Sequence, residues 1–157
     1  MTELPLGDGR ILAILGGYFA LLQRHFGAEE MMEAVLTEDF ETGFVDGVAW
    51  KGLDGLRDFL SQRAGFFDER HEVEEILARD VLDTGDLEVK TRLQFVLRRW
   101  QDPAATSEEF TGAALHTWRL RRTDDGWRVA AQMVDGFEDL NESSKRLFAR
   151  PDEGLNR

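Results

Sequence analysis

The sequence lacks cysteine altogether and contains only three prolines, three histidines and one tyrosine among its 157 residues. Without thiols the chain can form no disulfide, and it has neither a cysteine nucleophile nor a thiolate ligand for zinc. The absence of disulfides suits a reducing compartment, so we expect a cytoplasmic protein. The three histidines also lack the spacing of a metal-binding motif, and we therefore expect no metal site.

Positive charge is the second shortage. Lysine and arginine number 19 against 31 aspartates and glutamates, which gives a formal net charge of -12. Nucleic acids and anionic membranes both repel a strongly acidic surface, so neither is expected as a partner. We interpret the excess of carboxylates as a source of solubility.

Long hydrophobic runs are missing too. The run from Ile11 to Leu22 is shorter than the roughly 20 residues that cross a bilayer. The acidic Glu3 and Asp8 before it are unlike the basic start of a signal peptide. Its large apolar residues instead recur at steps of three and four: Leu12, Leu15, Phe19, Leu22 and Phe26. This spacing predicts an amphipathic helix over about residues 9–25.

Two further helices are predicted in the first half of the chain. Residues 28–36 form a short one, whose acidic Glu29 and Glu30 suit its N-terminal end. Residues 53–67 form a longer one with an apolar stripe through Leu56 and Phe59. Short extended pieces and turns are expected between these two helices.

The second half of the chain changes to the period of two that is typical of strands. Strands are predicted for residues 87–100, 110–122 and 127–137, with a tight turn between the last two. Another strand begins at His71, but its residues fit two registers, one with Val73 inward and one with Ile76 inward. Three helices followed by about four long antiparallel strands predict an α+β fold, in which a strongly bent, cone-shaped sheet wraps around the N-terminal helices.

Strand parity places an imidazole and a carboxylate inside this cone. His116 shares a face with the apolar Ala114 and Trp118, and Asp135 shares one with the apolar residues of the last strand. With simple pairing around the turn, Met133 lies opposite His116 and Asp135 lies diagonal to it. An adjacent aspartate raises the basicity of a histidine and fixes its tautomer, so this pair could transfer protons near neutral pH.

The order of these elements and several motifs resemble the SnoaL-like branch of the nuclear transport factor two-like superfamily. The motifs are the first helix through "LTEDF", the "WKGLDGLRDFL" turn and helix, "RHEVEEI" at a strand start, and the closing hairpin "HTWRLRRTDDGWRVAAQ". The resemblance covers about residues 8–140 and implies a cystatin-like α+β barrel with an apolar pocket. The superfamily includes ketosteroid isomerase, scytalone dehydratase, polyketide cyclases and dehydrochlorinases, together with proteins that are not enzymes.

Within this superfamily the chain is most similar to the scytalone dehydratase type. In that group one histidine opens the first long strand and another lies on a later strand, and His71 and His116 match these positions. Those enzymes also use tyrosines and an aspartate from the early helix and loop, where this chain departs from the pattern. Tyr18 resembles the tyrosine with which ketosteroid isomerases support an oxyanion, and Asp46 is the nearest candidate for a base on the early loop.

The resemblance implies cofactor-independent acid–base chemistry by a dehydratase or isomerase on a cyclic, aromatic or polyketide-like substrate. His71 and His116 would act as acid and base. Asp135 would orient His116, and Tyr18 would polarise an oxygen. Side chains expected to bind the apolar ligand are Phe44, Asp46, Trp50, Trp118 and Met133. A non-catalytic small-ligand-binding domain and a protein-interaction domain with a filled interior stay open as alternatives.

The outer face of the predicted sheet is rich in arginine, with Arg92, Arg98, Arg119 and Arg121. Members of the superfamily often dimerise through this face, so the resemblance implies a homodimer. We place one domain at residues 1–140 and treat residues 141–157 as a polar tail. Leu147 and Phe148 are the apolar exceptions in the tail, and they could cap the pocket mouth or pack on a neighbouring subunit.

Overall fold

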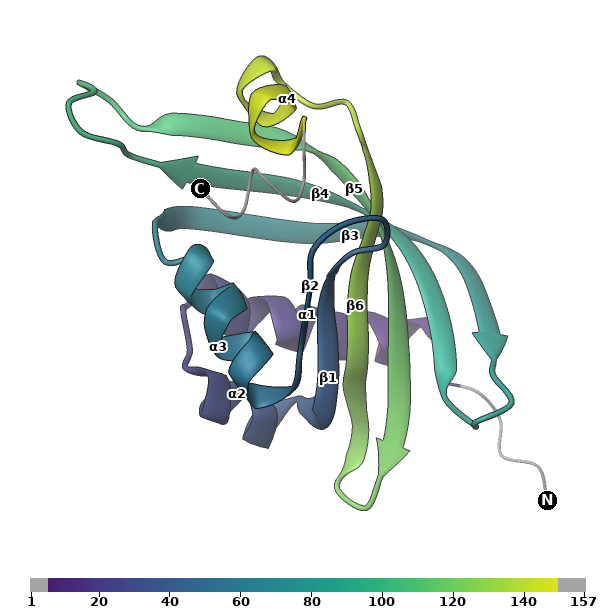
Figure 1. The fold of residues 1–157 in the computed structure, drawn as a ribbon. Coiled ribbons are helices and arrows are strands. Elements are labelled where there is room, and N and C mark those ends of the chain that lie inside the picture. Colours follow the sequence, from purple (N-terminus) through teal and green to yellow (C-terminus); the bar gives the residue numbers. More distant parts are fainter. Residues whose placement is uncertain (1–5, 150–157) are drawn as a thin grey trace.

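Three of the four helices come before the four long strands, and the last helix follows them (Figure 1). The computed structural model describes residues 6–149. Within this range the helices are α1 (Asp8–Gln23), α2 (Ala28–Ala34), α3 (Gly52–Gln62) and α4 (Glu142–Phe148). The strands are β1 (Leu36–Phe44), β2 (Ala49–Lys51), β3 (Phe66–Val81), β4 (Leu87–Arg99), β5 (Glu108–Thr123) and β6 (Gly126–Glu138). The predicted α+β fold class is confirmed, although β3 begins at Phe66, before the predicted His71.

The strands form one curved, open sheet in the order β2-β1-β6-β5-β4-β3. Strands β3 to β6 follow one another as antiparallel neighbours. Strand β1 joins this sheet parallel to β6 and pairs antiparallel with the short β2. Figure 1 shows the sheet bending around α1, α2 and α3, which occupy its concave side.

The core lies between the concave face of the sheet and α1. On β4, the alternate side chains Leu87, Val89, Leu93, Phe95 and Leu97 are buried, as strand parity predicts. The opposing stripe of α1 is buried as well, through Ile11, Leu15, Tyr18, Phe19 and Leu22. Burying one leucine or phenylalanine side chain contributes about 1.5–3 kcal/mol, so these two stripes hold the helix on the sheet. No helix within residues 6–149 is long and apolar enough to cross a membrane.

Strand β3 uses both of the registers that its sequence allows. Val73 lies opposite Leu93 and Ile76 lies opposite Thr91, and both apolar side chains pack against the core. Irregularities between Val73 and Glu75 and again after Ile76 shift the register. A bulge inserts one extra residue and thereby reverses the alternation of side chains, so neither simple pattern could describe the whole strand.

The hairpin of β5 and β6 departs from the predicted register in its central part. Near the turn, Leu120 lies opposite Val129 as predicted, but the register shifts beside it. Met133 therefore lies opposite Thr117, and the prediction that it faces His116 is wrong. A second shift follows at Asp135, so the prediction that this carboxylate faces inward is also wrong. Asp135 is exposed, and its Oδ2 accepts a hydrogen bond from the Thr117 hydroxyl at 2.6 Å.

Part of the predicted polar tail is the helix α4, which lies over β5 at the top of the view in Figure 1. The side chain of Asn141 caps this helix by accepting a hydrogen bond from the Ser144 backbone N–H. Leu147 is buried, and the ring of Phe148 stacks on Phe137 with centroids 4.2 Å apart. These contacts attach the C-terminal segment to the domain as far as Ala149, and residues 150–157 lie outside the described part of the chain.

Gly43 provides a stability test for the join between β1 and β2. Its φ is +147°, and a Cβ at this position would lie 2.3 Å from the Val48 carbonyl oxygen. Because the obstacle is backbone, we expect Gly43→Ala to destabilise the protein by roughly 1–3 kcal/mol in denaturant unfolding. Gly16→Ala is the matched control, because a Cβ at this exposed position of α1 would contact no other atom. This variant should be more stable than the wild type by up to about 1 kcal/mol. Equal effects of the two substitutions would contradict this account.

Candidate functional site

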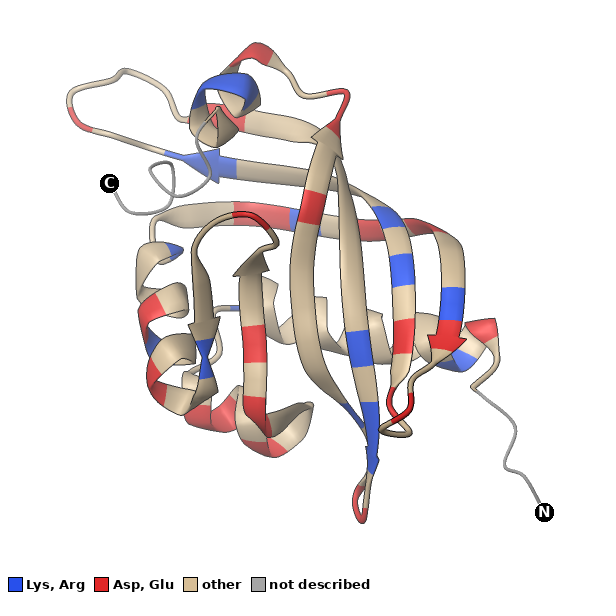
Figure 2. Ribbon diagram, turned by 45° about the vertical axis from the view of Figure 1, so that its right-hand side comes forward, with Lys and Arg blue, Asp and Glu red and all other residues tan. Residues whose placement is uncertain are grey.

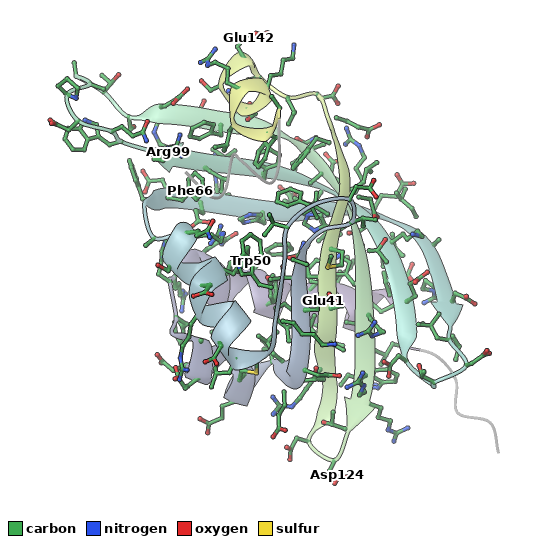
Figure 3. All side chains as sticks on the ribbon, in the orientation of Figure 1. Glu41, Trp50, Phe66, Arg99, Asp124 and Glu142 are labelled. Carbon is green, nitrogen blue, oxygen red and sulfur yellow. The ribbon has the colours of Figure 1, made fainter. Side chains whose placement is uncertain are left out.

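A cavity of about 100 Å³ lies between the concave sheet face and the helices. Its walls are mainly aromatic, formed by Phe19, Phe44, Phe59, Phe66, Phe95, Phe137 and Phe148. Five side chains bring polar groups to it: Thr42, Arg63, His71, His116 and Gln132. A dry cavity of about 150 Å³ accommodates benzene, so a ring-shaped ligand here needs a small movement of the walls. Figure 3 shows Phe66 among the side chains that fill the space between the sheet and α3.

His71 is held in one tautomer by Gln23 from the end of α1. The Oε1 atom of Gln23 accepts the backbone N–H of His71 at 2.7 Å and also lies 3.0 Å from its Nδ1. A backbone N–H can only donate, so the amide atom it meets is the oxygen. The same oxygen must then receive a proton from Nδ1. Neutral His71 therefore carries its proton on Nδ1 and leaves Nε2 as a proton acceptor.

His116 is held in the opposite tautomer by Gln132 of β6. The Gln132 oxygen accepts hydrogen bonds from the hydroxyls of Thr42 at 2.8 Å and Tyr18 at 3.3 Å. Its Nε2 lies 3.1 Å from Nδ1 of His116 and can only donate. The proton of neutral His116 is therefore on Nε2, which makes this nitrogen a hydrogen-bond donor.

Both imidazoles are neutral at neutral pH. Burial, the Arg63 guanidinium and His116 together hold the pKa of His71 well below its usual range. Burial alone lowers the pKa of His116 to about 3. Both rings lie close to Phe19, whose centroid is 4.6 Å from that of His71 in a stacked arrangement and 6.3 Å from that of His116. The lining of the cavity thus includes one histidine whose Nε2 is an acceptor and one whose Nε2 is a donor.

A buried ion pair forms the wall next to α3. Arg63, at the C-terminal end of α3, hydrogen-bonds through Nη2 to Oε1 of Glu69. The other carboxylate oxygen of Glu69 lies 2.9 Å from Nε2 of His25. The side chain of Glu69 is fully buried, whereas that of His25 is 37% exposed. The partly exposed His25 thus connects solvent to a carboxylate behind the cavity wall.

Several predicted site residues lie outside the cavity lining. Tyr18 is fully buried behind Gln132, and burial raises the pKa of Tyr18 to about 12. The indole of Trp118 is also fully buried and donates to the Thr91 hydroxyl at 2.9 Å. Trp50 packs against the Phe59 ring with centroids 5.2 Å apart. Asp46 is exposed in the turn between β1 and β2.

The remaining predicted residues divide between the two faces of the sheet. Phe44, His71 and His116 line the cavity. Met133 and Asp135 belong to the outward-facing part of β6, because the pairing with β5 places them beside Thr117. The position predicted for the aspartate beside His116 is taken by Gln132.

Sequence reasoning missed Gln23, Gln132 and Arg63. Gln23 lies at the polar end of an amphipathic helix, where a surface role is the ordinary interpretation. Gln132 appeared to face outward because strand parity was counted without a bulge. One feature of the sequence could have identified Arg63. It follows the apolar stripe of α3, at a position where a charged side chain needs a buried partner. Among residues 6–149 we find no group of three or more histidines and carboxylates that could hold a metal ion.

The comparison that decides the family covers most of the chain. A family model described as a SnoaL-like domain matches residues 9–132. The chain belongs to the SnoaL-like family. No curated protein matches the sequence of this SnoaL-like chain.

Solved structures with the same fold include proteins with three different names. A candidate scytalone dehydratase from Novosphingobium aromaticivorans is 16% identical, with a TM-score of 0.67 and coverage of 84% of each chain. ActVI-ORFA from Streptomyces coelicolor is 17% identical, with a TM-score of 0.62 and coverage of 82% of this chain and 95% of its own. A hexachlorocyclohexane dehydrochlorinase is 11% identical, with a TM-score of 0.65 and coverage of 85% and 87%. These similarities establish the fold of this SnoaL-like chain, which is called cystatin-like in other solved structures that are similar to it.

The two cavity histidines predict a stability that falls as the solution becomes mildly acidic. An unfolded histidine takes up a proton near pH 6.5, whereas the folded protein holds the pKa of His71 and His116 below that value. Stability is therefore lost as the pH falls from about 6.5 toward the folded pKa values. Between pH 7 and pH 5.5 we expect a loss of about 1 kcal/mol for each histidine, measured by denaturant unfolding.

His116→Gln supplies the comparison for this effect, because glutamine keeps an acceptor for Gln132 but does not titrate. The variant should lose about half of the pH-dependent change in the free energy of unfolding. The lowered pKa of the Asp39 carboxyl changes the free energy of unfolding only at a pH more acidic than this interval. A wild-type stability that is constant between pH 7 and pH 5.5 would refute the burial of both rings as neutral groups.

Proposed function

We propose that this SnoaL-like protein catalyses proton transfer without a cofactor on a small, largely apolar ring compound, as a dehydratase or isomerase does. The observation that carries the proposal is the pair of opposite tautomers. Nε2 of His71 is the base that removes a proton from carbon, and Nε2–H of His116 donates a hydrogen bond to an oxygen of the bound molecule. Gln23 and Gln132 are positioning residues, because they fix which nitrogen of each ring carries the proton.

The low basicity of His71 sets a condition on this chemistry. A neutral imidazole in an apolar cavity resists protonation because a buried positive charge lacks hydration. Negative charge that develops on the substrate during proton removal lies close to the ring and raises its basicity. His71 therefore becomes an effective base only when the substrate is bound and gains charge, which favours the transition state over the empty site.

Two of the structurally similar proteins support this class of reaction through their names. A dehydratase removes water and a dehydrochlorinase removes hydrogen chloride. Both eliminations need a base beside a carbon and a group that assists departure of the leaving atom. The cavity size favours a one-ring substrate over the larger polyketide-like molecules that the family resemblance allows.

A non-catalytic ligand-binding domain is the second candidate. It is favoured by the lowered pKa of His71, since an imidazole that resists protonation is a weak base in the empty site. The cavity counts against the third candidate, a protein-interaction domain whose interior is filled by side chains.

Hydrogen–deuterium exchange separates the first two candidates. Cyclohexanone incubated with the protein in D₂O should take up deuterium beside its carbonyl group, followed by NMR. His71→Ala removes the base and should slow the protein-dependent exchange about 100-fold or more, while the affinity for cyclohexanone changes little.

Asp135→Asn is the matched control, because the structure places this carboxylate on the outer face. We expect its exchange rate to equal that of the wild type. Binding of cyclohexanone with no exchange above buffer would favour the ligand-binding domain and sink the catalytic proposal.

We also propose that two copies of the chain pair through the outer face of the sheet. Figure 2 shows both basic and acidic positions along the long strands. Arg92 contacts Glu74, Glu138 and Asp139 of its own chain. This internal pairing lowers the repulsion between two acidic copies. Phe67, opposite Arg98 on this face, is 39% exposed and offers an apolar contact.

Sedimentation equilibrium tests the proposed dimer. Phe67→Glu should shift the protein toward the monomer, because it places a charge in the interface. Val45→Glu is the control, since Val45 is 55% exposed in the turn between β1 and β2, away from this face. A monomeric wild type, or equal effects of the two substitutions, would contradict the proposed interface.

A further inference from the structure

Arg63 is the one charged side chain that faces the cavity, counting lysine, arginine, aspartate and glutamate among the described lining residues. Its backbone N–H contacts the carbonyl oxygens of Phe59 and Leu60 at the end of α3. The whole residue is only 6% exposed. The position of the guanidinium is therefore set by the end of a helix and by tight packing.

The guanidinium is only partly satisfied. Its Nη2 is bound to Glu69, and its Cζ lies 5.7 Å from the centroid of the Phe59 ring and 5.9 Å from that of Phe66. Its Nη1 is buried and has no hydrogen-bond partner within the described part of the chain. A buried donor without an acceptor is unfavourable, so an acceptor supplied by a bound molecule would be stabilising.

The charges around this donor indicate which acceptor suits it. Glu69 balances the charge of Arg63, and both cavity histidines are neutral at neutral pH. A carboxylate on the ligand would add an unbalanced negative charge to an apolar cavity, which is strongly unfavourable. A neutral carbonyl oxygen would accept the Nη1 hydrogen without disturbing the charge balance.

We propose that Nη1 of Arg63 donates a hydrogen bond to the carbonyl oxygen of an uncharged ligand, and so selects ketones over hydrocarbons and carboxylates. The assignment rests on the proton-transfer function proposed above, since it identifies the oxygen that gains charge. When His71 takes a proton from the adjacent carbon, the C–H electron pair forms a carbon–carbon double bond. The carbonyl then becomes an enolate oxygen, whose charge Arg63 stabilises.

Equilibrium binding of three one-ring probes tests the assignment by NMR titration. Cyclohexanone and methylenecyclohexane have nearly the same shape but differ in the acceptor oxygen, and cyclohexanecarboxylate carries a charge. The wild type should bind cyclohexanone about tenfold more tightly than methylenecyclohexane. The double variant Arg63→Met/Glu69→Gln removes the donor and its balancing charge together, and this preference should disappear.

Glu69→Gln alone is the matched control, because it keeps Nη1 and removes the balancing charge, together with the carboxylate beside His25. The preference for cyclohexanone should persist, and the affinity for cyclohexanecarboxylate should rise about tenfold or more as the cavity becomes cationic. Thermal unfolding first shows which variants are folded. If the double variant is not, Arg63→Lys, which lacks the planar fork of donors, must weaken the ketone preference.

A wild type that binds cyclohexanone no better than methylenecyclohexane would overturn the assignment, and so would a folded double variant that keeps the preference. Binding requires no turnover, so this result is independent of the exchange experiment. If the wild type shows no preference for the ketone but still catalyses His71-dependent exchange, only the proposed role of Arg63 is wrong. A ketone preference without exchange removes the catalytic role of His71 and leaves Arg63 as a ligand-binding residue.

Discussion

The difficulty of placing charge in an apolar cavity governs the chemistry of this protein. Taking up a second proton would give either imidazole a positive charge, which is unfavourable in this cavity. Each ring is therefore neutral, and a neutral ring has one donor nitrogen and one acceptor nitrogen that both need partners. Gln23 and Gln132 are suited to this task because an amide offers both an acceptor and a donor without charge. One glutamine presents its oxygen and the other its nitrogen, and this difference makes Nε2 of His71 an acceptor and Nε2 of His116 a donor.

The same reasoning explains why glutamine stands where an aspartate was expected. An aspartate beside His116 would raise the basicity of the ring, but its own charge would need a buried partner. The bulges of β6 settle which side chain faces inward: they turn Gln132 toward His116 and leave Asp135 with the Thr117 hydroxyl in solvent. A shift of one residue in a strand thus replaces a charged pair by a neutral one and changes the character of the site.

Whether the sequence predicts a feature of this structure depends on how far apart in the chain the residues that form it lie. The alternation of β4 and the tight turn after Thr123 are local patterns, and they were predicted correctly. The stripe of α1 was predicted in part: Leu15, Phe19 and Leu22 are buried, but Leu12 is 40% exposed. Bulges leave little trace in a sequence, so parity failed in β3 and β6. The contact between Gln23 and His71 joins residues far apart in the chain, and no local pattern could reveal it. His116 was found because a polar residue on an apolar strand is itself a local anomaly, whereas His71 was named only through the family resemblance.

The size of the molecule that fits depends on the C-terminal helix. The cavity is smaller than one that holds a single aromatic ring, and most of its walls belong to the sheet or to helices packed on it. Phe148 is the exception, because it comes from the short α4 and reaches the cavity by stacking on Phe137. A short helix contributes little stability of its own. The wall formed by Phe148 therefore yields most readily, and it belongs to a different element from Gln23 and Gln132, so a ligand widens the cavity there without disturbing either tautomer.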